Sequence, residues 1–315
     1  PERAEAVIAD RSVLEEAAAR RAAELYALTR KADTAQYYAK QSARATTRLF
    51  NDQMLAERVR QKYIQDLVSQ PAREGLFWLS YQAIVRLSDG QTVGAEALLR
   101  MRSPELGNIS PTEFIPIAER IGAIQPLGEW AFATVRDQLA ARIDRLPPGF
   151  TVSVNVSPRQ LDNDSLLDLA LATVREQPDV ARRIRIEITE SDIVGDERLA
   201  RIHALREAGY SIAIDDFGSE YASLQYLVRI SADVLKLDKS FTDRLEAEPA
   251  SRTIVAHVID MAAEMKMKVI AEGIETEAER DILAGMGCQF GQGYLWDRPS
   301  REFDRFLVPI PIQLG

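Results

Sequence analysis

Eight short apolar segments between Leu76 and Tyr294 constrain the fold of this chain more than any other feature. They centre on Tyr81, Ala97, Val154, Ile186, Ile214, Leu235, Val269 and Phe290. Helical patterns separate all of these segments except the first two. Strands that alternate with helices in this way are typical of a (β/α)8 barrel, in which a sheet of mostly parallel strands closes on itself. The sequence therefore predicts an α/β fold of the TIM-barrel type.

The connection between the first two segments departs from this rhythm. Only residues 87–92, which contain Asp89-Gly90, lie between them. A parallel pair of strands needs a crossover of about a dozen residues or more, whereas Asp-Gly favours a tight hairpin. We therefore expect the first strand to run antiparallel to the second, which makes this a modified barrel.

Each apolar segment carries a polar or charged residue within it or at its downstream end. These residues are Gln82, Glu96, Asn155, Glu187, the pair Asp215 and Asp216, Lys236, Glu272 and Gln292. Active sites of such barrels lie at the C-terminal ends of the strands, so we expect these side chains to meet at one mouth. Five carboxylates and an amide together favour a site for divalent metal ions.

The donor atoms also indicate which metal to expect. The two histidines, His203 and His257, fall in helical patterns away from the strand ends, and Cys288 is the single cysteine. This set of residues argues against zinc, and an oxygen-rich shell favours Mg²⁺ or Mn²⁺. Asn155 would add a neutral oxygen ligand, which limits the negative charge around the metal.

Simpler interpretations exist for the glutamates on the strands. Glu96 could be an exposed strand residue, but Val93, Ala97 and Leu98 indicate a strand that is buried on both faces. A charge there needs a partner, either Arg100 or a metal. Glu187 alternates with isoleucines, so it lies either inside the barrel near the mouth or under the helices.

Asp215, Asp216 and Lys236 also have alternative explanations. Adjacent aspartates at a strand end repel each other unless cations neutralise them, although Asp also favours turns and helix caps. Lys236 could act on water or phosphate, or it could form a structural ion pair with Asp238 or Glu272.

Composition limits the class of protein. Hydrophobic residues make up 46% of the chain, which is enough for a full core, and no apolar stretch approaches the length of a bilayer span. A net charge of −9 argues against a general nucleic-acid binder. A single cysteine fits a reducing compartment. We therefore expect a cytoplasmic domain, which a longer protein could still anchor to a membrane upstream.

The N-terminal region has a different character from the rest. Residues 2–70 contain neither Gly nor Pro and are rich in Ala, Glu, Arg and Leu, which predicts helix almost throughout. A partial apolar stripe is formed by Leu14, Ala18, Leu25 and Leu28, and it is compatible with a solvated connector or with a signalling or dimerising helix. We predict a helical extension over residues 1–71 and a barrel over residues 72–315.

Three helix starts are marked by capping patterns. Ser110 precedes Pro111 and Glu113, Ser157 precedes a proline, and Thr276 stands three residues before a glutamate. Each pattern predicts that the first side chain caps the helix that follows.

The polar residues occur in motifs that together resemble one family. Glu96-Ala97-Leu98-Leu99-Arg100 is similar to the motif that names the EAL domain, the family of cyclic di-GMP phosphodiesterases, and the similarity extends over nearly all of residues 76–300. The other matching motifs are Asn155-Val156-Ser157, Glu187-Ile188-Thr189-Glu190, Asp215-Asp216-Phe217-Gly218, Lys236-Leu237-Asp238, Ala271-Glu272-Gly273-Ile274-Glu275 and Gln292-Gly293-Tyr294. A single three-letter motif would be weak, but this ordered series is specific.

The resemblance implies hydrolysis of cyclic di-GMP to linear pGpG with two Mg²⁺ or Mn²⁺ ions, in a modified barrel with an antiparallel first strand. It assigns one ion to Glu96, Asn155, Glu187 and Asp215, and the other to Asp215, Asp216 and possibly Glu272. A water activated between the ions would attack phosphorus.

The resemblance also implies roles for the remaining motif residues. Lys236 would position that water or stabilise charge on the phosphate, and Gln292 matches a residue at the metal-water site. Arg100 and Gln82 would contact the substrate, and Arg100 would bind a phosphate. Glu190 and Glu275 match residues that support the loop after Asp216 and the site, and we count Glu275 with the substrate-binding residues.

Departures from the family pattern affect the expected activity. The family loop after Asp-Asp-Phe-Gly usually continues with Thr-Gly-Tyr, but here Glu220 replaces the glycine. A side chain there would be strained if the position needs a positive φ, and it adds negative charge near the site. The alternative function is therefore a weak or inactive EAL domain that acts as a cyclic di-GMP receptor. An unrelated barrel phosphodiesterase for lipid head groups would share the metal chemistry but not the motifs.

The extension carries a second, shorter resemblance. Ala32-Asp33-Thr34-Ala35 with Tyr38-Ala39-Lys40 is similar to the last helix of a GGDEF domain, although an ordinary alanine-rich helix would look the same. This resemblance implies a bacterial signalling protein with a GGDEF or sensor domain upstream. Family members often pair through their barrels, so we also expect a homodimer.

Overall fold

The computed structural model describes a barrel domain and part of the helical extension. The described residues are 20–33, 35–36, 51–70, 75–189, 195–218, 227 and 229–307. The chain divides into two compact units, Pro1–Leu67 and Val68–Gly315. Residues 20–33 of the first unit are helical, and helix α2 spans Asp52–Val68. Leu25 and Leu28 of the predicted apolar stripe are 65% and 62% exposed.

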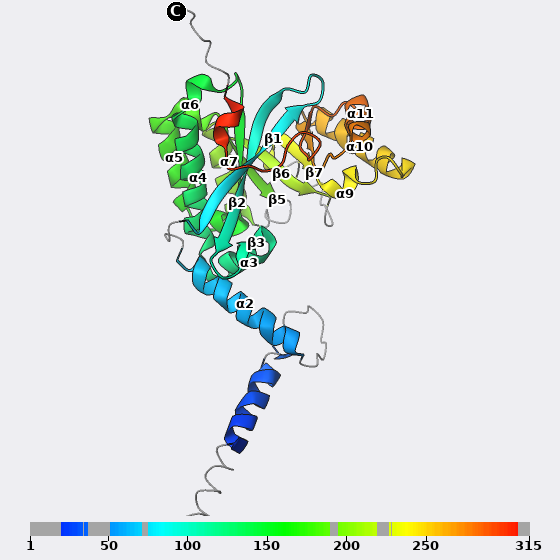
Figure 1. Cartoon of the computed structure of the whole chain (residues 1–315). Coiled ribbons are helices and arrows are strands. Elements are labelled where there is room, and N and C mark those ends of the chain that lie inside the picture. Colours follow the sequence, from blue (N-terminus) through cyan, green and yellow to red (C-terminus); the bar gives the residue numbers. More distant parts are fainter. Residues whose placement is uncertain are drawn as a thin grey trace, which may run out of the picture. The chain divides into compact units, whose positions relative to one another are not determined.

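The second unit is built on a sheet that closes into a barrel (Figure 1). The strands are β1 (Phe77–Arg86), β2 (Thr92–Ser103), β3 (Gly107–Ile109), β4 (Thr151–Asn155), β5 (Ile184–Thr189), β6 (Ser211–Phe217), β7 (Val234–Leu237), β8 (Lys268–Ala271) and β9 (Phe290–Gly291). Their order is β1-β9-β8-β7-β6-β5-β4-β2-β3, and an additional β1–β2 pairing closes the ring. All eight predicted strands are present. The short strand β3 was not predicted.

The first strand has the predicted direction. β1 and β2 pair antiparallel from Phe77↔Met101 to Val85↔Thr92, and the two long strands are the cyan pair in Figure 1. β1 also runs antiparallel to β9, whereas β2, β4, β5, β6, β7, β8 and β9 pair in parallel around the ring. The modified barrel is therefore confirmed, and the reversed β1 has an antiparallel neighbour on each side.

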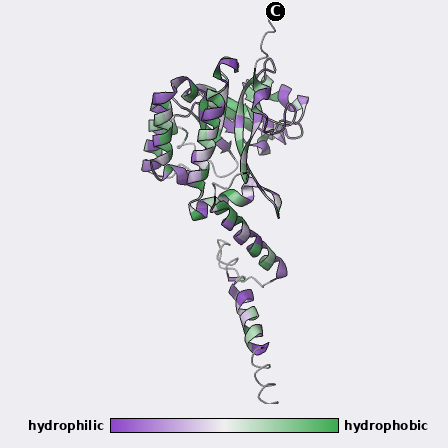
Figure 2. Cartoon of the chain, turned by 60° about the vertical axis from the view of Figure 1, so that its left-hand side comes forward, coloured by the Kyte–Doolittle hydropathy of each residue, from purple (hydrophilic) through white to green (hydrophobic). Residues whose placement is uncertain are grey.

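Helices surround the barrel. They are α3 (Pro111–Ile121), α4 (Ile124–Ala140), α5 (Ser165–Glu176), α6 (Pro178–Ala181), α7 (Asp196–Glu207), α9 (Lys239–Thr242), α10 (Pro249–Glu264) and α11 (Glu277–Gly285), with the 3-10 helices η1 (Ile143–Arg145), η2 (Pro158–Leu161) and η4 (Phe303–Phe306). Helices α4 to α7 lie on one side of the strands and α10 with α11 on the other (Figure 1). In Figure 2 these helices carry bands of both hydrophobic and hydrophilic residues, as expected for helices that bury one face. None of the described helices is long and apolar enough to cross a membrane.

The capping predictions are confirmed at two of three positions. The Ser157 side chain accepts from a backbone N–H at the start of η2, and Thr276 forms a capping box with Glu279 at the start of α11. Ser110 does precede α3, but its side chain makes no capping hydrogen bond to the backbone. Its hydroxyl instead lies 2.7 Å from the hydroxyl of Thr112. Ser110 therefore occupies the predicted N-cap position, but the prediction that its side chain caps the helix was wrong, since the hydroxyl contacts Thr112 instead.

The barrel interior is layered by the two-residue period of its strands. Ile84, Ala213, Val234 and Ile270 form a buried apolar cluster inside the barrel, with Phe290 packed against it. Successive side chains of a strand point to opposite faces, so the next inward position lies two residues away. In the parallel strands that position is two residues downstream, and in the reversed β1 it is two residues upstream. The apolar cluster is thus the floor on which a second interior layer rests.

Truncation of two apolar residues outside the barrel should have clearly different effects on the free energy of unfolding. Phe132 of α4 is fully buried, whereas Ile254 of α10 is 51% exposed. Phe132→Ala should lower the free energy of unfolding by about 3–5 kcal/mol, because it removes buried apolar surface and leaves a cavity. The control Ile254→Ala should change it by about 0.5 kcal/mol or less. Urea unfolding followed by circular dichroism measures both, and equal effects would contradict the assigned core.

Candidate metal centre and active site

The second interior layer consists almost entirely of polar residues. Each barrel strand contributes one of them, within the strand or directly after it: Gln82, Glu96, Asn155, Glu187, Asp215, Lys236, Glu272 and Gln292. Asp215, Lys236, Glu272 and Gln292 each follow a residue of the apolar layer by two positions, and Gln82 precedes Ile84 by two. Strand alternation therefore gathers side chains that are up to 210 residues apart in sequence.

Lys236 lies at the centre of this layer and is 1% exposed. Its Nζ lies 2.7 Å from Glu272 Oε1, 2.9 Å from Asp215 Oδ1, 3.0 Å from Glu187 Oε2 and 3.4 Å from Glu96 Oε2. An ammonium has three protons to donate, so this cluster is held by charge as well as by directional hydrogen bonds. The simpler interpretation of Lys236, an ion pair with Glu272, is thus present as part of a larger network. Asp238 caps α9 instead, through a hydrogen bond from the Ser240 N–H.

Two amide side chains also donate hydrogen bonds to Glu96. Asn155 Nδ2 donates to Glu96 Oε1 at 2.7 Å, and Gln292 Nε2 donates to Glu96 Oε2 at 2.8 Å. Gln292 Nε2 also donates to Gln82 Oε1 at 3.0 Å. Sequence reasoning proposed Arg100 or a metal as the partner of Glu96 and missed Lys236, which is the cation that contacts it.

A backbone bend lets both adjacent aspartates face the same site. Side chains of neighbouring strand residues normally point to opposite faces, but Asp216 has a φ of 53°. Asp is one of the residue types that tolerate this left-handed conformation. Strand register is also shifted between Ile214 and Phe217. The bend therefore lets both carboxylates approach the same group of acidic side chains.

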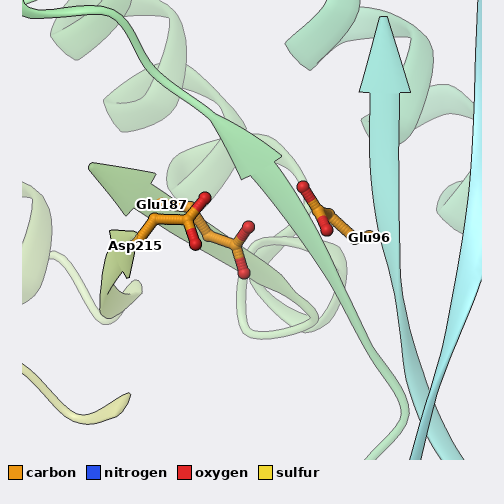
Figure 3. Close-up of side chains that lie close together, drawn as sticks. All are labelled: Glu96, Glu187 and Asp215. Atoms are coloured by element: carbon orange, nitrogen blue, oxygen red, sulfur yellow. The ribbon is translucent and has the colours of Figure 1, made fainter. Parts of the chain in front are cut away.

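The carboxylates form two overlapping groups that could hold metal ions. Oxygen atoms of Glu96, Glu187 and Asp215 lie within 4.8 Å of one another, and so do those of Asp215, Asp216 and Glu272. Figure 3 shows the first group, with Glu96 on one strand facing Glu187 and Asp215 from the opposite side. Asp215 belongs to both groups, so one carboxylate is common to the two candidate sites.

Burial and mutual repulsion change the acidity of these groups. Burial raises the pKa of Glu187 to about 7, with further contributions from the charges of Glu96 and Asp215. Partial burial and the neighbouring Asp215 raise the pKa of Asp216 to about 6. Burial also raises the pKa of Glu272 well above its usual range. For Glu96, burial is outweighed by Lys236 and by hydrogen bonds from Asn155 and Gln292, so its pKa is lowered.

Two cavities open on either side of Glu96. The first, of about 480 Å³, is largely apolar, and its polar wall includes Arg100, Asn155 and Asp216. The second, of about 330 Å³, is lined by Gln82, Glu96, Leu98, Asp215, Asp216, Lys239, Glu272, Gly273, Glu275, Gln292, Gly293 and Tyr294. Arg100 and Glu275 are therefore beside the polar layer rather than in it. Glu275 forms an ion pair with Lys239 at 2.6 Å, a contact that sequence reasoning did not identify.

Glu190, which we expected to support the loop, and Glu220, the departure from the family pattern, both lie outside the described residues.

Comparison with known proteins identifies the family. The family model for the EAL domain matches residues 64–299. The chain belongs to the EAL domain family. It is 33% identical over 270 residues to the bifunctional diguanylate cyclase/cyclic di-GMP phosphodiesterase MucR of Pseudomonas aeruginosa, covering 85% of this chain and 39% of MucR. It is 36% identical over 225 residues to the cyclic di-GMP phosphodiesterase PA2567 of the same organism, covering 71% of this chain and 38% of that protein. The chain thus spans about two fifths of the length of these curated relatives.

Solved structures agree with this assignment. A MucR phosphodiesterase structure in complex with c-di-GMP superposes with a TM-score of 0.72 at 32% identity, covering 78% of this EAL domain protein and all of that chain. The EAL enzyme Bd1971, bound to cAMP and cyclic-di-GMP, superposes with a TM-score of 0.70 at 34% identity, covering 79% of this chain and 69% of that one. The modified barrel is therefore the architecture of known EAL domains.

The chemistry of the polar layer inside the barrel fits divalent metal ions. All candidate ligand atoms are oxygens, the donors that Mg²⁺ and Mn²⁺ prefer. Glu187 Oε1 and Gln292 Oε1 are buried without a hydrogen-bond partner among the described residues. Such atoms are costly to leave unsatisfied, and a bound ion or its water would satisfy them.

The raised carboxyl pKa values predict how stability depends on pH when no metal is bound. Because the pKa of Glu187 is raised to about 7, the folded protein holds a proton that the unfolded chain releases near pH 4.5. The stabilisation that comes from this proton on Glu187 is complete below pH 4.5 and is lost as the pH rises through about 7. Calorimetry in EDTA should therefore show a falling Tm over this range.

Metal ions should reverse this trend. Mn²⁺ should raise the Tm more at about pH 8 than at about pH 5, since bound cations compensate the ionised carboxylates. In the control Glu187→Gln, which cannot ionise, the fall in Tm in EDTA should be smaller. An equal gain from Mn²⁺ at both pH values would contradict the assigned metal centre.

Proposed function

We propose that this domain hydrolyses cyclic di-GMP to linear pGpG with the help of two divalent ions, Mg²⁺ or Mn²⁺. The observation that carries the proposal is the complete polar layer, in which every strand of the barrel supplies a side chain to one mouth. The names of the relatives support the substrate, since MucR and PA2567 are cyclic di-GMP phosphodiesterases. The c-di-GMP complex of the MucR phosphodiesterase supports binding at this fold.

The charge balance of the layer supports two ions rather than one. Glu96, Glu187, Asp215, Asp216 and Glu272 would carry five formal negative charges when ionised, and Lys236 offsets one of them. Two divalent cations would offset the remaining four. Buried charge that is not compensated in this way costs several kcal/mol per group. We assign one ion to Glu96, Asn155, Glu187 and Asp215, and the other to Asp215, Asp216 and Glu272.

The side chains would divide the work of hydrolysis. Bound ions would lower the pKa of water and so supply a nucleophile near neutral pH. Lys236 fixes the carboxylates that define the ion positions, and its charge would stabilise negative charge that develops on the phosphate. Arg100, half-buried at the wall of the first cavity, would bind a phosphate oxygen. Gln82, Gln292 and Glu275 line the second cavity, where they would contact the other side of the substrate.

The alternative is a receptor that binds cyclic di-GMP without turnover, and Glu220 is the feature that favours it. Incubation with cyclic di-GMP and Mg²⁺ or Mn²⁺, followed by chromatography for pGpG, decides between the two. Formation of pGpG supports the phosphodiesterase, and tight binding without pGpG supports the receptor.

We further propose that the domain works inside a longer cytoplasmic signalling protein, as a homodimer, with a GGDEF or sensor domain upstream. The helical extension of residues 1–71 would then connect that domain to the barrel of residues 72–315. The upstream domain is supported by MucR, a bifunctional diguanylate cyclase/cyclic di-GMP phosphodiesterase of which the chain spans only 39%.

Loss of one metal ligand should separate turnover from folding. Glu96→Gln keeps the size of the side chain but removes the charge that faces Lys236, Asn155 and Gln292. We expect pGpG formation to fall about a hundredfold or more while the circular dichroism spectrum is unchanged. The control Glu197→Gln replaces a glutamate that is 90% exposed on α7 and should leave the rate within about twofold. Normal turnover by Glu96→Gln would remove this residue from the metal centre.

A further inference from the structure

The barrel has a seam beside the active site, between β1 and β9. These strands pair only through Val85↔Gly291 and Arg86↔Phe290, at the end of β1 that lies away from the mouth. Toward the mouth β9 has already ended, and the next backbone pairing with β1 is at Ser300, where Tyr81 N–H donates to Ser300 O at 2.7 Å and Ser300 N–H donates to Tyr81 O at 3.0 Å. The red η4 helix that follows lies beside the cyan strands in Figure 1. Residues 297–306 therefore close the barrel at the height of Gln82.

The seam is fastened by an ion pair between Asp297 and Arg305. Arg305 Nη1 lies 2.8 Å from Asp297 Oδ1, and Arg305 Nη2 lies 2.5 Å from Asp297 Oδ2, so both carboxylate oxygens are bound. Bidentate pairs of this kind fix orientation as well as distance. Arg305 Nη2 also donates to the backbone oxygen of Tyr81 at 2.6 Å. The guanidinium thus ties Asp297 to β1 directly.

Asp297 then holds the backbone and side chain of the adjacent residues of β1. Its Oδ2 accepts a hydrogen bond from Ala83 N–H at 3.1 Å, and its backbone oxygen accepts one from Gln82 Nε2 at 3.2 Å. Gln82 Oε1 accepts from Gln292, which in turn donates to Glu96. A continuous chain of hydrogen bonds therefore leads from the ion pair on the outside of the barrel to a carboxylate of the metal centre.

We propose that the Asp297–Arg305 pair is a positioning element that sets the orientation of Gln82 and, through Gln292, of Glu96; the inference rests on the proposed function of that centre. Neither Asp297 nor Arg305 lines the two cavities beside Glu96. The pair acts by fixing the rotamer of Gln82, because one side of that amide is bound by Asp297 and the other by Gln292. Small displacements of groups at a reacting centre cost rate out of proportion to their size, since catalysis depends on alignment.

The chain offers a matched control for this proposal. Arg142 forms an ion pair with Asp304 and lies 5.8 Å from the centre of the Phe303 ring, so it anchors the same C-terminal segment. It belongs to neither β1 nor the hydrogen-bond chain that leads to Glu96. Arg142→Gln should therefore loosen the segment without disturbing Gln82. Arg305→Gln and Asp297→Asn remove the pair itself, and Arg305→Lys keeps its charge but cannot bind both carboxylate oxygens.

The experiment measures kcat, KM, Tm and amide hydrogen exchange in the four variants and the unaltered protein. Arg305→Gln and Asp297→Asn should lower kcat about tenfold and speed exchange at the Ala83 amide, at a Tm within a few degrees of that of Arg142→Gln. Arg305→Lys should recover part of kcat, and Arg142→Gln should keep it within about twofold. A role in folding alone would make kcat follow Tm across all four variants. That result, or normal kcat in Arg305→Gln and Asp297→Asn, would overturn the proposal.

The unaltered protein separates this proposal from the proposed function. If it binds cyclic di-GMP in Mn²⁺ without forming pGpG, hydrolysis is wrong, and the same variants are compared by their Kd for cyclic di-GMP. A Kd that rises about tenfold in Arg305→Gln and Asp297→Asn but not in Arg142→Gln supports positioning. A Kd that is equal in all three variants refutes it.

Discussion

The contact of Lys236 with four carboxylates is the interaction on which the rest of the site depends. A lysine that is 1% exposed would lose its proton in an apolar core, but the surrounding carboxylates raise its pKa well above the usual value despite its burial. The carboxylates need the lysine in return, because buried negative groups at such short distances repel one another. Lysine and carboxylates therefore stabilise each other, and a barrel that lacks bound ions still keeps the candidate ligands in one place.

The same network explains why the carboxylates differ in acidity although they share a partner. Glu96 receives hydrogen bonds from two amides in addition to Lys236, and its pKa is lowered. Glu187 is at least as buried, but one of its oxygens has no hydrogen-bond partner in the described part of the chain, and its pKa is raised to about 7. Lys236 and hydrogen bonds to the charged form lower the pKa of Glu96, whereas burial and the charges of Glu96 and Asp215 raise that of Glu187. Glu187 is the group for which binding of a cation brings the larger gain.

The fold could be predicted from the sequence because its signals are local. Each strand shows its period within a few residues, and the six residues after Arg86 are too few for a parallel crossover. The ring of polar residues followed from the position of active sites in barrels. Strand β3 was missed because Gly107–Ile109 is only three residues long and is defined by its pairing with β2 rather than by its own pattern. The partner of Glu96 was missed because the distance between side chains across a barrel depends on the closed geometry.

The seam shows a further limit of sequence reasoning and gives a reason for the network around it. Asp297 and Ala83 are 214 residues apart, and no strand or helix pattern connects them. The antiparallel β1 forms backbone hydrogen bonds with β2 along its whole length. On its other side, β9 is two residues long and leaves the part of β1 near the mouth without a full strand neighbour. Backbone groups exposed at such an edge must be paired by other means. Here an aspartate, an arginine and a two-bond bridge to Ser300 provide those partners, and they do so next to Gln82. The irregular first strand therefore creates the need for the contacts that align the side chains inside the mouth.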